Sequence, residues 1–123
     1  MGVRKGDRVA ALLGNEPDWL TVCFGCAYAG AIFVPLNTWY KSSEIDWTLR
    51  HCSISTIVFA PNFLKQDFGA ILSQLLPELK SCAPGELKAA RYPALRSLIA
   101  YGTEQRGSFG WQDFLDLGRS VAV

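Results

Sequence analysis

The sequence has 123 residues, of which half are hydrophobic and 19% are charged, and its formal net charge at pH 7 is +1. This composition favours one folded domain and excludes an intrinsically disordered chain. The basic side chains are spread along the chain without forming a cluster, so we expect no nucleic-acid partner. The first residues, MGVRKGDRV, are too polar for a secretory signal, so we expect a cytoplasmic location.

The first part of the sequence predicts a strand, a helix and a second strand. The apolar run DRVAALLGN indicates a buried strand from Arg8 to Leu13. A helix is expected over 17–29, with Asn15 as its cap and a proline and acidic residues near its first turn. Gly30 is expected to end this helix in the left-handed conformation, between two buried elements. The segment IFVPLN then predicts a short buried strand.

The residues from Trp19 to Tyr40 include no charged side chain, which raises the alternative of a membrane span. Such a span needs about 20 apolar residues in one continuous helix. The Gly30-Ala31 pair and Pro35 instead divide the run into a helix and a strand, and neither is long enough to cross a bilayer. We therefore expect no transmembrane segment and interpret the run as a buried helix, turn and strand.

Helices and strands continue to alternate in the rest of the sequence. The segment SSEIDWTLRHC predicts a helix capped by Ser42 or Ser43, and the β-rich run SISTIVFAP predicts a strand. In NFLKQDFGAILSQLLPEL, an apolar stripe from Leu64 to Leu76 predicts a helix over 62–79. LRSLIAYG is expected to form a fourth strand, YGTEQRGSFG a surface turn and WQDFLDLG a short helix. The alternation predicts an α/β fold, a parallel sheet with covering helices.

The cysteines and the single histidine are the candidates for a metal or redox site. Cys23 and Cys26 form a CxxC pair, and His51 with Cys52 could supply two further zinc ligands. However, the pair lies in the middle of a predicted helix among apolar residues, whereas reactive dithiols lie at an exposed helix N-terminus. We therefore expect Cys23 and Cys26 to be buried packing residues and His51 to be a solvated surface residue, with no metal bound.

Ligands of parallel sheets bind beyond the carboxyl ends of the strands, which here directs attention to 14–15, 36–38 and 61–62. None of these segments contains a phosphate-binding glycine pattern, because the sequence has neither GxxxxGK[ST] nor GxGxxG. We therefore assign no catalytic, cofactor-binding or metal-binding residue to the chain.

The segment GVRKGDRVAALLGNEPDWLTVCFGCAYAGAIFVPLN resembles the early N-terminal part of the adenylate-forming enzymes, the AMP-binding superfamily of acyl-CoA synthetases. The matching features are Gly6-Asp7-Arg8-Val9, Asn15, Gly25, Ala29-Gly30-Ala31 and Val34-Pro35-x-Asn37. EIDWTLRHC and STIVFAP match the next helix and strand of the family. LRSLIAYG with GWQDFLDLG is similar to a later strand and short helix of carboxylic-acid and fatty-acid CoA ligases. The resemblance covers most of the chain and is best from Gly2 to Ala60.

The resemblance implies that the complete enzyme uses ATP and Mg²⁺ to activate a carboxylic or fatty acid as an acyl-adenylate, and then transfers the acyl group to CoA. This chain departs from the family pattern. It lacks the Ser/Thr/Gly-rich phosphate loop ending in Pro-Lys, the aromatic adenine-binding segment, the ribose-binding aspartate, the hinge and the catalytic lysine of the C-terminal domain.

We therefore expect residues 1–123 to form a single partial N-terminal domain, truncated at both ends relative to the family. The fragment is expected to bind no cofactor by itself, to be catalytically inactive alone and to pack with the remainder of the ligase fold. The alternative is a stand-alone, non-catalytic binding or regulatory module that partners a ligase subunit.

Overall fold

The structure is a computed structural model, and it describes residues 2–118. The elements, in chain order, are β1 (Arg8–Leu12), α1 (Pro17–Ala29), β2 (Ile32–Pro35), α2 (Ser42–His51), β3 (Thr56–Phe59), β4 (Asn62–Phe63), β5 (Gln66–Asp67), α3 (Phe68–Leu75), the 3₁₀ helix η1 (Pro77–Lys80), β6 (Ser97–Ala100), β7 (Phe109–Gly110) and α4 (Trp111–Gly118).

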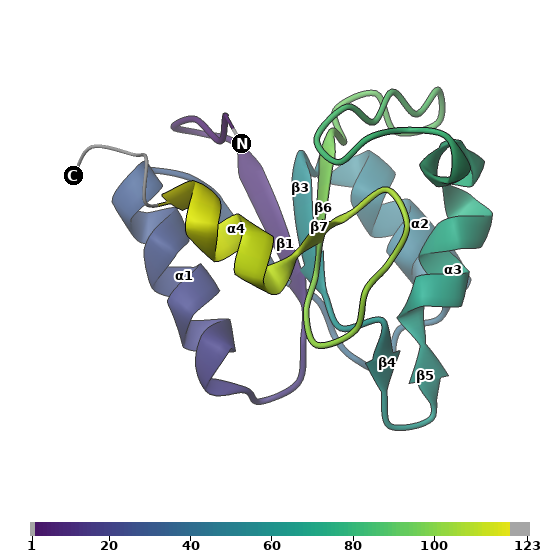
Figure 1. Ribbon diagram of the computed structural model, residues 1–123, viewed down its shortest axis with the longest axis horizontal. Coiled ribbons are helices and arrows are strands. Elements are labelled where there is room, and N and C mark those ends of the chain that lie inside the picture. The colour runs from purple at the N-terminus through teal and green to yellow at the C-terminus, as the bar shows by residue number, and fades with distance from the viewer. Residues whose placement is uncertain (1, 119–123) are drawn as a thin grey trace.

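Five of the strands form a parallel sheet in the order β2-β1-β3-β6-β7, and β4 pairs with β5 in a separate antiparallel hairpin. Helices α1 and α4 lie on one side of this sheet, and α2 and α3 lie on the other (Figure 1). Strands β3 and β6 are buried along their whole length, as expected for inner strands of a sheet that is covered on both faces. The predicted parallel sheet with covering helices is therefore confirmed.

Alternate side chains of the strands supply two apolar clusters, one on each face of the sheet. Leu12, Ile57 and Leu98 belong to the larger cluster, which contacts α2 and α3. Val58 and Ile99 belong to the smaller cluster, which contacts α1 and α4. Burying one aliphatic side chain of this size stabilises a fold by about 1.5–3 kcal/mol, so the face covered by α2 and α3 contributes more of the apolar stabilisation.

Helix α1 has the predicted range but a different cap. Its N-cap is Glu16, not Asn15, and no side chain accepts a hydrogen bond there; Pro17 occupies the first turn. Gly30 ends the helix with a φ of 73°, which confirms the left-handed stop. The expectation that Gly30 lies between two buried elements is wrong, because it is exposed and the nearest atoms to a Cβ placed on it belong to Lys5.

The charge-free run is divided between α1 and β2, as predicted. Among residues 2–118, no helix is both long and apolar enough to cross a membrane. Strand β2 is not buried as expected: it lies at the edge of the sheet, and Ile32 is 49% exposed. The sequence pattern could not distinguish an edge strand from an inner one, because strand order depends on contacts between distant segments.

The segment after β3 differs most from the prediction. The hairpin of β4 and β5 occupies 62–67, and α3 begins only at Phe68. The side chain of Asp67 caps this helix, because its Oδ1 accepts a hydrogen bond of 2.9 Å from the backbone N–H of Ala70. Leu64 has a φ of 51° and is 88% exposed, so it does not extend the apolar stripe of the helix. Beyond Leu75 the expected helix is replaced by η1, which starts at Pro77.

Two further details correct the sequence-based expectations. Lys41, not Ser42 or Ser43, is the N-cap of α2, and its backbone N–H donates a hydrogen bond of 3.3 Å to Glu44 Oε1. The two-residue strand β7 lies within the segment expected to be a surface turn. A strand of two residues is too short to show an alternating pattern.

Candidate functional site

The order of the strands identifies one position where open α/β sheets often hold a ligand. From β1 the chain forms β2 on one side, and β3 and the later strands are added on the other side of β1. In such sheets, ligands bind beyond the carboxyl ends of the strands, where the order reverses. In this structure that position lies between the ends of β1 and β3, next to Gly14 and Pro61.

The β4–β5 hairpin covers this position. A Cβ atom placed on Gly14 would lie 2.3 Å from Phe63 Cε2, so the phenyl ring rests directly on the glycine backbone. Gln66 Nε2 donates a hydrogen bond of 3.3 Å to the Thr38 carbonyl, which ties the hairpin to the segment after β2. The structure therefore brings the segments 14–15, 36–38 and 61–62 together, but the hairpin of the same chain packs over them.

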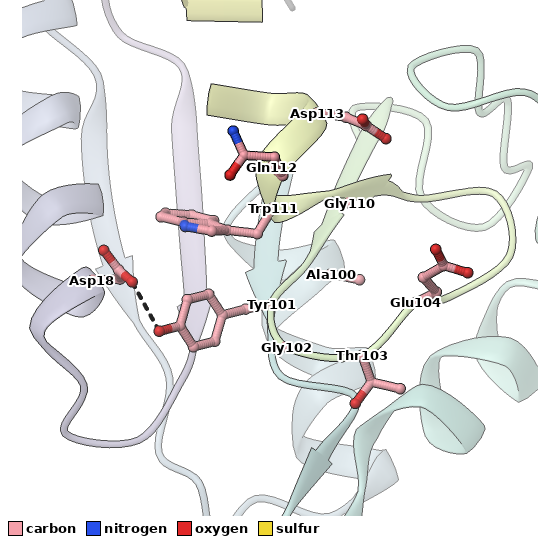
Figure 2. A pocket seen from close by; sticks show the side chains of 10 residues that line it. All are labelled: Asp18, Ala100, Tyr101, Gly102, Thr103, Glu104, Gly110, Trp111, Gln112 and Asp113. Atoms are coloured by element: carbon pink, nitrogen blue, oxygen red, sulfur yellow. Dashed lines mark hydrogen bonds between the residues drawn. The ribbon is translucent and has the colours of Figure 1, made fainter. Parts of the chain in front are cut away.

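An open crevice lies further along the same edge of the sheet, where β6 and β7 end (Figure 2). It encloses about 510 Å³ and is lined by Asp18 of α1, by the segment 100–104 and by the segment 110–113. Parallel pairing of β6 with β7 places the ends of these strands beside each other. Residues from α1 and from the last third of the chain therefore form one concave surface.

The polar groups that join α1 to β6 are already hydrogen bonded to each other. Tyr101 Oη donates a hydrogen bond of 2.8 Å to Asp18 Oδ2, and Thr21 Oγ1 donates one of 3.3 Å to Asp18 Oδ1. The bond to Asp18 raises the pKa of Tyr101, since it stabilises the neutral phenol. The indole of Trp111 meets the Tyr101 ring edge to face, with centroids 5.2 Å apart. This arrangement connects helix α1 to the sheet through Asp18 and Tyr101.

The charge of the crevice argues against a phosphate ligand. Its charged lining residues are Asp18, Glu104 and Asp113, and no lysine, arginine or histidine lines it. Phosphate sites in proteins are built from cationic side chains or from backbone N–H groups of glycine-rich loops. Among residues 2–118, no group of three or more His, Cys, Asp or Glu side chains is arranged to hold a metal ion. The side chains of the crevice therefore offer a phosphate group no cationic partner.

One of the two basic residues that line a hollow near the start of α2 is already paired with a carboxylate. A shallow hollow there is lined by residues that include Lys41 and Arg91. The guanidinium of Arg91 is engaged by Asp46, with Nε–Oδ1 and NH2–Oδ2 distances of 2.8 and 2.9 Å. This bidentate pair neutralises the cation at the surface of the hollow.

The fold separates the residues considered for a zinc site. Cys23 and Cys26 lie on α1, whereas His51 ends α2 on the opposite side of the sheet (Figure 1). Cys26 is buried as predicted, but Cys23 is partly exposed, so the expectation of burial is wrong for Cys23. The His51 ring stacks on Trp47 with centroids 4.3 Å apart. The two halves of the candidate site therefore cannot share one metal ion.

The sequence pattern does not single out Tyr101 or Trp111, and Asp18 is there only one of the acidic residues near the first turn of the predicted helix. No local motif connects positions 18 and 101, which are 83 residues apart. The one available signal was the general rule that ligands lie at the carboxyl ends of parallel strands. At the end of the fourth predicted strand, LRSLIAYG, the same rule points to Tyr101.

Residues 2–118 thus form an open α/β sheet whose switch point is covered by the chain's own β4–β5 hairpin. Residues 1–105 match the family described as AMP-binding enzyme. The Bacillus subtilis (strain 168) protein named "Putative acyl-CoA synthetase YngI" is 35% identical over 122 residues, which are 98% of this chain and 22% of that protein. The mitochondrial medium-chain acyl-CoA ligase ACSF2 of Danio rerio is 33% identical over 97% of this chain and 20% of its own length.

Solved structures show the same fold. The anthranilate CoA ligase AuaEII, in complex with anthranoyl-AMP, superposes with a TM-score of 0.71 at 24% identity, over 94% of this chain and 18% of the ligase. The N-terminal domain of FACL13 from Mycobacterium tuberculosis superposes with a TM-score of 0.60 at 21% identity, over 98% of this chain and 24% of that domain.

This chain belongs to the AMP-binding enzyme family. It has the α/β fold of part of the N-terminal domain of the adenylate-forming CoA ligases, and it spans about a fifth of the length of the curated relatives named here.

Proposed function

We propose that this chain is a structural part of an ATP-dependent acyl-CoA ligase and that it catalyses neither adenylation nor thioester formation by itself. In this proposal residues 1–123 are one partial domain, and none of them is a catalytic residue. The observation that carries the proposal is the chemistry of the open crevice, whose charged lining consists of carboxylates without a cation. A triphosphate would be repelled there, because like charges at close range disfavour binding.

The substrates and cofactors in this proposal are those of the complete enzyme. ATP, Mg²⁺, CoA and a carboxylic or fatty acid would bind to parts of the ligase fold that this chain does not contain. A fatty acid as the substrate is supported by the name of one relative, which is called a medium-chain acyl-CoA ligase. A cytoplasmic location is part of the proposal and agrees with four unpaired cysteines within residues 2–118, although the ACSF2 relatives are named mitochondrial.

The first test uses the 123-residue chain alone. It is incubated with ATP, Mg²⁺, CoA and a panel of medium-chain, long-chain and aromatic acids, and pyrophosphate release is followed. We expect no release above a blank without protein. Acid-dependent release that copurifies with the chain through two further columns would contradict the proposal of inactivity.

The second test asks whether this chain can replace the matching segment in the fold of a complete acyl-CoA synthetase. In a chimera, this chain replaces the matching segment of YngI, and acyl-CoA formation is compared with intact YngI and with YngI lacking the segment. We expect the chimera to be active and the deletion variant to be inactive. A chimera that folds, shown by a cooperative thermal transition, but forms no acyl-adenylate would contradict the assignment to an acyl-CoA ligase.

A further inference from the structure

Helix α1 is apolar on both its inner and its outer face. Val22 and Cys26 on the inner face are buried against the sheet. On the outer face, Leu20, Phe24 and Tyr28 are 51%, 62% and 94% exposed. These three residues are spaced by four positions and therefore form one row along the helix, which we call the α1 apolar row. An outer row of this kind is unusual for a helix that faces water.

Helix α2, on the other side of the sheet, has the pattern expected for a water-facing helix. Ile45 and Leu49 on its inner face are buried, whereas Arg50, whose side chain is 47% exposed, forms an ion pair of 3.1 Å with the partly buried Asp46. Its Trp47 is 55% exposed and stacks on the ring of His51 in the same helix. A helix that is apolar all round is usually buried on all sides in the complete protein. We therefore expect protein to cover the outer face of α1 and water to cover the outer face of α2.

Helix α4, like α1, leaves apolar side chains exposed on this side of the sheet. It lies beside α1 on the same side of the sheet (Figure 1). None of its residues, Trp111–Gly118, is buried, and Leu115 is 40% exposed. Its inner aromatic residues, Trp111 and Phe114, are partly buried and pack against the smaller cluster. Within residues 2–118, no other element covers the layer formed by α1 and α4 (Figure 1).

We infer that the α1 apolar row is the surface on which the rest of the ligase fold packs. This inference rests on the proposed function. It is supported by length, because the chain is 22% of YngI and 20% of ACSF2, so most of the fold lies outside it. A membrane surface is a poorer occupant, because helices that bind membranes carry lysine and arginine beside their apolar face. Helix α1 has no basic residue, and its charged side chain is Asp18.

The test compares solvent access of the row in the isolated chain and in the YngI chimera by hydroxyl-radical footprinting with peptide-resolved mass spectrometry. We expect oxidation of Phe24 and Tyr28 to fall by about fivefold or more in the chimera, as side chains in the core of an interface are fully buried. Trp47 serves as the control, and its oxidation should not change. Equal oxidation of Tyr28 in both proteins would overturn the inference. Intact YngI is footprinted in parallel, so that strong oxidation of its matching helix would overturn the inference even if the chimera fails to fold.

A matched pair of variants tests the same surface without an activity readout. Phe24→Glu should lower the melting temperature of the chimera by at least about 5 °C, because it buries an unpaired charge, and should leave that of the isolated chain nearly unchanged. Trp47→Glu should have the same small effect in both proteins. A loss with Phe24→Glu that is equal in both proteins would overturn the inference.

Two other occupants of the row are tested with the same variant. One is a second copy of the isolated chain, detected as a defined dimer, and the other is a membrane, detected as binding to phosphatidylglycerol vesicles. Either form of binding would overturn the inference if it persists in the chimera and is abolished by Phe24→Glu. Because these readouts measure coverage, an inactive chimera with a protected row would reject the proposed function and not this inference.

Discussion

The hydroxyl of Tyr92 donates a hydrogen bond of 2.6 Å to Asp46 Oδ1, and this bond joins the segment before β6 to helix α2. Tyr92 is 1% exposed, and its neighbour Arg91 binds both carboxylate oxygens of Asp46. Arg91, and to a smaller extent the Tyr92 hydroxyl, hold the pKa of Asp46 well below its ordinary value. Burial, together with the bond to Asp46, raises the pKa of Tyr92 to about 12. A loop without regular structure is thereby held against a helix.

We expect Tyr92→Phe to lower the free energy of unfolding at pH 7 by about 1.5–3 kcal/mol, the usual worth of a hydrogen bond to a charged group. Urea unfolding followed by circular dichroism measures the change. The matched control is Tyr28→Phe, because Tyr28 is 94% exposed and has no comparable bond to lose. If both variants have the same urea midpoint, the bond between Tyr92 and Asp46 does not stabilise the fold.

The same cluster predicts a dependence of stability on pH. The folded pKa of Asp46 lies below its ordinary value of 3.8, so ionised Asp46 stabilises the fold above that value. The contribution is lost as the pH falls through the folded pKa. We therefore expect the advantage of the wild type over Asp46→Asn, measured as urea midpoints, to be largest near neutral pH and to shrink as the pH falls below about 4.

The size of this effect should also depend on salt. Asp46 is partly buried, but the side chains of Arg91 and Arg50 are 56% and 47% exposed, so solvent and ions screen the pairs. The difference between wild type and Asp46→Asn should therefore decrease in concentrated sodium chloride. A difference that stays constant between neutral pH and pH 2.5 would contradict the role given to Asp46.

The two cysteines of α1 should react at different rates. Burial raises the pKa of Cys26, with a smaller contribution from neighbouring Cys23, whereas Cys23 is partly exposed. We expect iodoacetamide to modify Cys23 at least about tenfold faster than Cys26 at pH 8, since only exposed thiolate reacts. Peptide mass spectrometry separates these two cysteines from Cys52 and Cys82. In urea the two rates should become similar, and equal rates in native buffer would show that α1 is not packed on the sheet as described.

Two glycines with the same backbone conformation should tolerate alanine differently. Gly107 and Gly102 have φ values of 78° and 90°, so alanine is strained at both by about 1–2 kcal/mol. A Cβ atom on Gly107 would lie 2.7 Å from the Leu79 carbonyl oxygen, whereas a Cβ on Gly102 would have no neighbour within 4 Å. Gly107→Ala should therefore cost about 1–3 kcal/mol more than Gly102→Ala in urea unfolding. Equal urea midpoints would mean that the loop before β7 does not pack against η1.

Several features that depend on neighbouring residues were predicted correctly from the sequence, although the N-caps of α1 and α2 were not. The range of α1 follows from Pro17, whose ring suits the first helical turn, and from Gly30, which accepts the left-handed conformation at the end. The alternation of strands and helices followed from apolar spacing and predicted the parallel sheet, and the run from Gly2 to Ala60 was sufficient to recognise the family. The signals for the helix ends lie within a few residues of those ends, and the apolar spacing lies within the strands and helices themselves.

The remaining features were decided by tertiary structure. The Asn62–Asp67 hairpin replaced an expected helix because Phe63 packs on Gly14, a contact across 49 positions that no local pattern records. The crevice depends on Asp18 meeting Tyr101, and the position of β2 at the sheet edge depends on which strands pair with β1. Apolar spacing shows that α1 has two apolar faces, but only the packed structure shows which of them the sheet covers. Burial is a property of contacts between distant segments, so it was settled only when the strands and helices came together.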